Sequence, residues 1–246
     1  MARASDYDSI GIGLPREWAT LPIEQRAFET MCDDLRRRWR DDPDWDRPTE
    51  RRAELLLARV RAEMRKVGIK AAAMYVESLG NPAEANAKSD VDTEAEAEVL
   101  MATVTFGIYT RADLETKLPL TLANLAAAFS APPRRTHEYK RITNLELPAL
   151  YELRPGKSIR LRRLYELEKP GRLPDRFYGE SFVLPLGDDN EACGILNFVT
   201  TNIDLASNFT LLFASIADTV TLWTPDDETA YEPRAAEPAP EAATAR

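Results

Sequence analysis

The sequence predicts an α+β protein in which one antiparallel sheet of about six to eight strands is flanked by helices, forming an α/β sandwich. Three patterns support this fold class: a strand–turn–strand–helix–strand succession at 177–223, a pair of amphipathic helices at 22–67, and several short alternating segments between them. Residues 1–224 are therefore expected to form a single α+β domain.

The succession at 177–223 is the most legible part of the chain. Strand-forming residues fill 178–186 and 192–200, and the turn-forming cluster 187–191 separates them, which predicts a β-hairpin. Both faces of 192–200 carry apolar side chains, so this segment is expected to be a central strand. Asp204 is the expected N-cap of a helix that ends near residue 217, and 219–223 is a last short strand.

The helix pair is predicted from 3.6-residue periodicity over 22–40 and 49–67. Gly68 is a typical C′ residue for the second helix. Because the connection is short, the two helices are expected to be antiparallel. Four residues are expected to form the buried stripe of the second helix: Leu56, Val60, Met64 and Val67.

The other predicted elements follow from alternation and turn residues. Further strands are expected at 7–14, 69–77, 98–110, 139–145, 149–153 and 158–167, and a helix is expected at 119–130. In 158–167, Arg160 and Arg162 share one face, which predicts a solvent-facing side and a place near a sheet edge. Segment 78–97 is expected to be a flexible acidic loop, and 225–246 a disordered acidic tail rich in Pro and Ala.

The formal net charge of −9 resides in two segments. Residues 80–98 contain six acidic residues and one Lys, residues 225–246 contain six acidic residues and two Arg, and the remaining body is neutral. This distribution argues against general nucleic-acid binding. No apolar run approaches the roughly 18 residues of a membrane span, so we expect a cytoplasmic protein without membrane insertion.

No catalytic constellation is evident, and neither a cofactor nor a metal is predicted. His137 is the single histidine, and Cys32 and Cys193 are isolated, so no zinc spacing is present and free thiols are expected. The pair Gly11 and Gly13 lacks the third glycine of a dinucleotide-binding loop.

The arginines of the helix pair are the candidate contact residues. A partner-binding surface for another protein is predicted at Arg36, Arg37, Arg38, Arg40 and Trp45. The alternative is a solvated helix face whose arginines pair with Glu50, Glu54 and Glu63; both interpretations stay open from the sequence.

The two ends of the chain carry a resemblance. The phrases Leu14-Pro-Arg-Glu-Trp18, Gly194-Ile-Leu-Asn-Phe-Val-Thr-Thr-Asn202 and Phe213-Ala-Ser-Ile-Ala217 resemble uncharacterised actinobacterial proteins and the Mog1/PsbP-like fold. That resemblance implies an antiparallel sheet flanked by helices. It also implies a non-enzymatic accessory or binding role, in some actinobacterial members beside a secretion system.

Three hypotheses about function follow. The first is a non-enzymatic, cytosolic accessory or protein-binding protein, associated with a bacterial secretion system. The second is a small-ligand-binding protein or enzyme, with a pocket between sheet and helices near His137, Tyr139 or Tyr165. The third is a homo-oligomer that associates through its helix pair.

Overall fold

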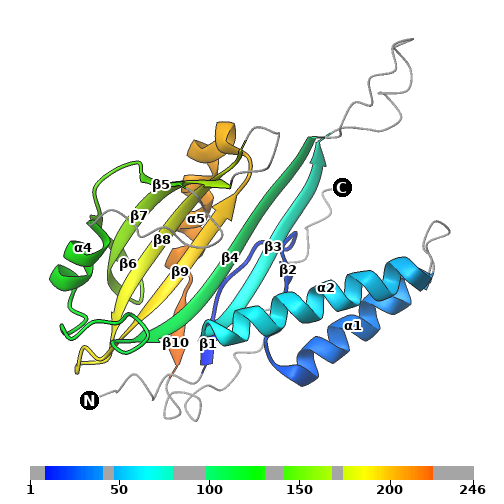
Figure 1. Ribbon diagram of the computed structural model, residues 1–246, viewed down its shortest axis with the longest axis horizontal. Helices are drawn as coiled ribbons and strands as arrows, with labels where there is room; N and C mark the ends of the chain where they lie inside the picture. Colours follow the sequence, from blue (N-terminus) through cyan, green and yellow to red (C-terminus); the bar gives the residue numbers. More distant parts are fainter. Residues whose placement is uncertain (1–8, 41–46, 80–97, 131–140, 168–173, 224–246) are drawn as a thin grey trace, which may run out of the picture.

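The computed structural model describes residues 9–40, 47–79, 98–130, 141–167 and 174–223. It confirms the α+β class: antiparallel sheets are flanked by four helices, and no sheet in the described part closes into a barrel (Figure 1). The predicted acidic tail lies outside the described residues. So does most of the predicted acidic loop, although Ser78 and Leu79 extend the preceding strand instead.

The main sheet has eight strands in the order β2-β3-β4-β9-β8-β7-β5, and β6 also pairs with β7. Its members are β2 (Ala19–Thr20), β3 (Ile69–Leu79), β4 (Glu98–Thr110), β5 (Arg141–Asn144), β6 (Ala149–Leu153), β7 (Gly156–Leu167), β8 (Asp175–Leu186) and β9 (Ala192–Thr200). Every pairing is antiparallel. The two-residue β2 was not predicted, because two residues carry no readable period.

A second, two-stranded sheet joins β1 (Ser9–Gly11) to β10 (Thr221–Trp223). Beside it, the Gly13 N–H donates to Thr219 Oγ1 over 2.8 Å. A Cβ on Gly13 would lie 2.9 Å from the Thr219 Cβ, so the close approach of the two segments requires glycine. Gly13 therefore serves chain packing.

Local turns set two of the sheet's hairpins. Gly187 follows β8 with a φ of +68° and Asn190 precedes β9 with a φ of +55°, a left-handed backbone that glycine and asparagine adopt at low cost. Gly156 opens β7 after the turn at Arg154 and Pro155. The pairing of β4 with β9 is non-local and places β9 in the interior of the sheet, as its two apolar faces predicted.

The helices are α1 (Gln25–Arg40), α2 (Arg47–Lys66), α4 (Leu122–Ser130) and α5 (Ala206–Asp218). All four predicted helices are present, but the predicted N-cap at Asp204 is wrong. Asp204 lies inside the 3-10 turn η2 (Ile203–Leu205), and α5 begins after Leu205 without a side-chain cap. The extra turn supplies i→i+3 backbone hydrogen bonds where a capping carboxylate was expected.

Two buried clusters occupy opposite faces of the sheet, because successive strand residues point to opposite sides. On one face α5 packs over an aromatic core that includes Phe182, Phe198, Phe209 and Phe213. On the other face α4 covers Ile159, Leu161, Val183 and Cys193. In Figure 1, α5 lies behind the central strands and α4 lies beside β6 and β7.

The helix pair lies at the side of the sheet that β2 and β3 form (Figure 1), and α2 contacts β3. Neither buried cluster of the sheet includes a described residue of α1 or α2. The predicted stripe of α2 is wrong at both ends, since Leu56 is 62% and Val67 57% exposed. The helix is rotated so that Arg61, only 7% exposed, lies inward instead.

The prediction for 158–167 is half right. β7 lies next to the sheet edge, because its outer partners β5 and β6 have no further partner strand among the described residues. The face of Arg160 and Arg162 does not face solvent, however. Their side chains are 15% and 26% exposed, because they turn toward the buried Glu180 on β8.

Candidate functional site

The helix pair holds four of the five predicted contact residues. Arg36, Arg37, Arg38 and Arg40 all lie in the last two turns of α1, whereas Trp45 lies outside the described residues. Arg37, Arg38 and Arg40 are exposed and Arg36 is half-buried. Their surface is therefore present on the molecule, although whether it binds a partner stays a prediction.

Part of this positive charge is paired within the helices. Arg36 bridges to Glu54 across the pair, and its Nη1 lies 2.6 Å from Asp33 Oδ1. The Glu54 carboxylate raises the pKa of Arg36, chiefly through this hydrogen bond. Arg37 contacts Asp34 in the same helix. The alternative of a self-paired helix face thus describes Arg36 and Arg37, but Arg38 and Arg40 have no carboxylate partner in the described part of the chain.

Arg61 ties α2 to the start of α1. Its Nε donates to the Ile23 carbonyl over 2.7 Å and its Nη1 to Gln25 Oε1 over 2.7 Å. The guanidinium also lies 5.2 Å from the centroid of the Phe28 ring, within cation–π range. Arg61 is therefore a structural residue, unlike the exposed arginines around it.

A groove of about 530 Å³ runs between α1 and α2. Its floor is apolar, because Phe28 and Cys32 are buried there and Ala58 adds little bulk. Leu55 borders it with 63% of its surface exposed. The remaining lining residues are polar or charged: Gln25, Glu29, Asp33, Arg36, Arg51 and Glu54. An apolar floor with a charged rim is typical of a surface that receives a side chain of another molecule.

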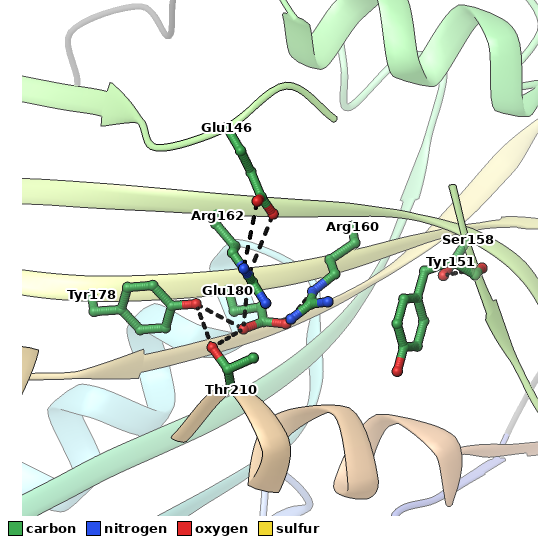
Figure 2. A network of polar contacts seen from close by, with 8 residues as sticks. All are labelled: Glu146, Tyr151, Ser158, Arg160, Arg162, Tyr178, Glu180 and Thr210. Atoms are coloured by element: carbon green, nitrogen blue, oxygen red, sulfur yellow. Dashed lines mark hydrogen bonds and ion pairs between the residues drawn. The ribbon is translucent and has the colours of Figure 1, made fainter. Parts of the chain in front are cut away.

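The densest polar cluster lies between the sheet and α5 (Figure 2). The Glu180 side chain on β8 is fully buried, and Arg160 Nε on β7 donates to its Oε1 over 2.5 Å. Its Oε2 accepts from the hydroxyl of Tyr178 at 2.8 Å and from that of Thr210 on α5 at 3.2 Å. One carboxylate thus connects two strands and a helix.

The second guanidinium of the cluster is shared. Arg162 Nε lies 3.7 Å from Glu180 Oε2 and 3.4 Å from Oε1 of Glu146, whose side chain is 41% exposed. Figure 2 shows Arg162 between these two carboxylates. Arg160 lies 5.2 Å from the Tyr151 ring centroid, so its guanidinium is enclosed by the carboxylate and an aromatic face.

This cluster is built to hold the fold together. Both oxygens of Glu180 are already occupied by protein donors, so the carboxylate has little capacity left to bind a ligand. Burial raises the pKa of Tyr178 to about 12, and the phenol therefore remains a neutral donor at physiological pH. Buried Arg160 Nη2 and Arg162 Nε have no hydrogen-bond partner among the described residues, which is a cost that the surrounding ion pairs must offset.

The raised pKa of Tyr178 predicts a loss of stability at alkaline pH. An unfolded tyrosine ionises near pH 10, so the folded state holds the Tyr178 proton more tightly than the unfolded state does. The resulting contribution to the free energy of unfolding is complete below pH 10. It disappears as pH rises toward about 12, with a magnitude of roughly 1–3 kcal/mol. Urea denaturation at several pH values should show a steeper decline between pH 10 and 12 for the wild type than for Tyr178→Phe. Equal slopes would contradict this role.

The other sequence candidates that the structure describes, Tyr165, Cys32 and Cys193, do not assemble into a second site. His137 and Tyr139 lie outside the described residues. The ring of Tyr165 lies across Gly179, where an added Cβ would clash with it. Cys32 and Cys193 are free and buried, and burial raises the pKa of the Cys193 thiol to about 12. Within the described residues, no group of three or more His, Cys, Asp or Glu side chains could hold a metal ion.

Sequence reasoning missed Glu180 and Arg61, and in both cases a signal was available. Glu180 alternates with Tyr178 and Phe182 along β8, so its side chain had to share their buried face. Arg61 follows Leu57 by four residues and precedes Met64 by three, which places it on the inner side of α2.

Comparisons with known proteins yield a remote likeness. No family model matches the chain, and no curated protein matches it. Among solved structures, LpqN, a protein involved in cell envelope biogenesis of Mycobacterium tuberculosis, aligns over 88% of this chain and 84% of its own. The identity is 12% and the TM-score 0.39, and a likeness of this degree carries no functional argument. None of the described helices is long and apolar enough to cross a membrane.

Proposed function

We propose that this protein is a non-enzymatic accessory protein that binds another protein through α1 and α2. The observation that carries the proposal is the surface of the helix pair, where α1 exposes Arg37, Arg38 and Arg40 and α2 exposes Leu55 and Leu56. A cytoplasmic location and an association with a bacterial secretion system belong to the same proposal. They are supported by the resemblance of the chain's two ends to actinobacterial accessory proteins.

The physical basis is the cost of leaving such a surface in water. Leu55 and Leu56, two consecutive residues of α2, are 63% and 62% exposed, and covering each is worth roughly 1–2 kcal/mol. Arginine is enriched at protein interfaces because its planar guanidinium forms forked hydrogen bonds and packs on apolar groups. Arg38 and Arg40 are available for such contacts at the end of α1.

Charge reversal of the predicted contact arginines should weaken partner capture. The variant Arg36→Glu/Arg37→Glu/Arg38→Glu replaces three positive charges on α1 by three negative charges, so an acidic partner surface would be repelled. Affinity capture from a lysate of the source cells, followed by mass spectrometry, should recover the wild-type partner at least about tenfold less with this variant. The wild-type capture should also decrease with added salt.

The matched control reverses three exposed lysines elsewhere, Lys70, Lys117 and Lys157, and should capture the partner as the wild type does. The arginine variant removes the bridge between Arg36 and Glu54, so its helix content has to be checked. Circular dichroism should show that both variants keep their helices. Equal capture by the wild type and the arginine variant would show that these arginines of α1 do not contribute to the interface. A wild-type protein that captures nothing specific would refute the accessory role.

A further inference from the structure

A small apolar pocket lies beside α4, away from the helix pair. It is formed by the connection between β4 and α4, residues 111–121, and by one side of α4 itself. In Figure 1, α4 lies at one side of the sheet, whereas α1 and α2 lie at the other, so the pocket is separate from the surface of the proposed function. We infer that this pocket binds a small, neutral, apolar molecule of about the size of one aromatic ring.

The walls of the pocket are apolar and carry no charge. Seven of the nine described residues that line it are apolar, and none of the nine is acidic or basic. Leu120 and Leu125 are its buried lining, and Leu118 borders it with 59% of its surface exposed. Arg163 lies over the ring of Phe129, 5.5 Å from the ring centroid, but it is not a lining residue. A charged ligand would therefore lose its hydration without gaining a counter-charge from the walls.

The two polar lining residues already make hydrogen bonds within the wall. Asn124 Nδ2 donates to the Pro119 carbonyl over 2.8 Å. The Thr116 hydroxyl accepts from the Leu118 N–H over 3.2 Å. Because both side chains support the connection that they belong to, the pocket offers its ligand mainly apolar contacts. This chemistry selects a molecule whose binding depends on apolar surface and not on ionic groups.

The wall is fixed in place without a ligand. The Arg111 guanidinium bridges to Glu191 over 2.5 Å, and the Leu120 N–H donates to the Asn190 carbonyl over 2.8 Å. Both ends of the connection are thereby attached to the turn between β8 and β9. Between them Glu115 has a φ of +50°, a backbone conformation that is unfavourable for a residue with a Cβ and persists only where its surroundings fix it. A ligand of this pocket does not have to order the wall before it can bind.

The volume of the pocket sets the size of the ligand. The pocket measures about 180 Å³, and an apolar cavity of about 150 Å³ is large enough to bind benzene. One ring with a small substituent therefore fills it. Water is a poor occupant, because apolar walls supply few of the hydrogen bonds that an enclosed water molecule needs. Ala128 contributes to this space, since its side chain is a single methyl group at a position where a larger one would project into the pocket.

The test is isothermal titration calorimetry of the full chain with two probes of the same shape. Nitrobenzene is neutral, whereas benzoate has a similar outline and carries a negative charge at neutral pH. Nitrobenzene should bind with a Kd of about 0.1–1 mM, the range expected for a ligand of one ring. Benzoate should bind at least about tenfold more weakly, because its carboxylate would be desolvated against uncharged walls.

Three variants locate the binding. Ala128→Phe fills the pocket with a ring of the protein's own and should weaken nitrobenzene at least about tenfold. Ala127→Phe makes the same change at the neighbouring position of α4, which does not line the pocket, and should bind nitrobenzene as the wild type does. Leu118→Asp places a hydrated charge at the border and should weaken nitrobenzene severalfold. All three positions are exposed, so circular dichroism should show that each variant keeps the wild-type fold.

Each outcome decides the inference. Selective binding of nitrobenzene that Ala128→Phe and Leu118→Asp weaken, and Ala127→Phe does not, supports it. Equal binding of nitrobenzene and benzoate overturns it, and so does the absence of nitrobenzene binding up to about 10 mM or binding that neither Ala128→Phe nor Leu118→Asp weakens. N-acetyl-phenylalaninamide should bind no more tightly than nitrobenzene, because its backbone exceeds the pocket. If it binds more tightly, the pocket receives a side chain of another protein and the inference of a free small molecule falls.

Discussion

Replacing Glu180 by glutamine is expected to lower the free energy of unfolding by about 3–5 kcal/mol, the largest effect of any single polar substitution considered. The substitution keeps the shape of the side chain but removes its charge. It leaves the guanidinium of Arg160, 2.5 Å away and 15% exposed, without a buried counter-charge. Urea denaturation followed by circular dichroism measures the difference as a shift of the midpoint.

Two further variants separate charge from packing. Glu146 has an exposed side chain and contacts Arg162, which also lies near Glu180. Glu146→Gln should therefore lower the free energy of unfolding by less than about 1 kcal/mol. The double variant Arg160→Met/Glu180→Leu replaces the pair by apolar groups and should recover much of the lost stability. A Glu180→Gln protein as stable as the wild type would mean that the buried pair contributes nothing to the fold.

Truncating Phe213 to alanine should cost about 3–5 kcal/mol as well, for a different reason. Its side chain is fully buried on α5, and its ring stacks on Phe198 with centroids 4.5 Å apart and an interplanar angle of 16°. A second ring, Phe209, lies 5.4 Å away. Alanine would leave a cavity where the helix meets the sheet, because the close-packed helix and sheet cannot fully collapse into it.

The control for this prediction lies two residues earlier on the same helix. Leu211 is 74% exposed, so Leu211→Ala should change the free energy of unfolding by no more than about 0.5 kcal/mol. Thermal and urea denaturation of both variants measure the contrast. Similar losses at the two positions would show that helix propensity, and not burial in the aromatic core, sets the stability of α5.

Local chemistry explains why so many elements could be predicted from the sequence. The β8–β9 hairpin follows from turn residues such as Gly187 and Asn190, which adopt a left-handed backbone. The central position of β9 follows from apolar residues on both of its faces. Each of these features depends on residues that are neighbours in the chain, so a single sequence contains the information.

Features that depend on distant partners could not be read in the same way. Arg160 looked solvent-facing because its counter-ion lies on another strand, and Asp204 looked like a helix cap because η2 cannot be distinguished from the first turn of α5. The same limit applies to the candidate site. The arginines of α1 were identified from sequence, but the pairing of Arg36 with Glu54 and the apolar floor under it depend on how α2 packs.

The pairing of β1 with β10 sets the order of events during synthesis on the ribosome. Ser9, Ile10 and Gly11 pair with residues 221–223, so the first strand must wait until more than two hundred further residues have been translated. At 5–20 residues per second this delay is about 10–40 s. During that interval Ile10 lacks its partner Leu222 on β10, and the side chains of Ile10 and Ile12 lack part of the core against which they pack in the folded protein. Completion of the fold is therefore coupled to the arrival of the last described strand.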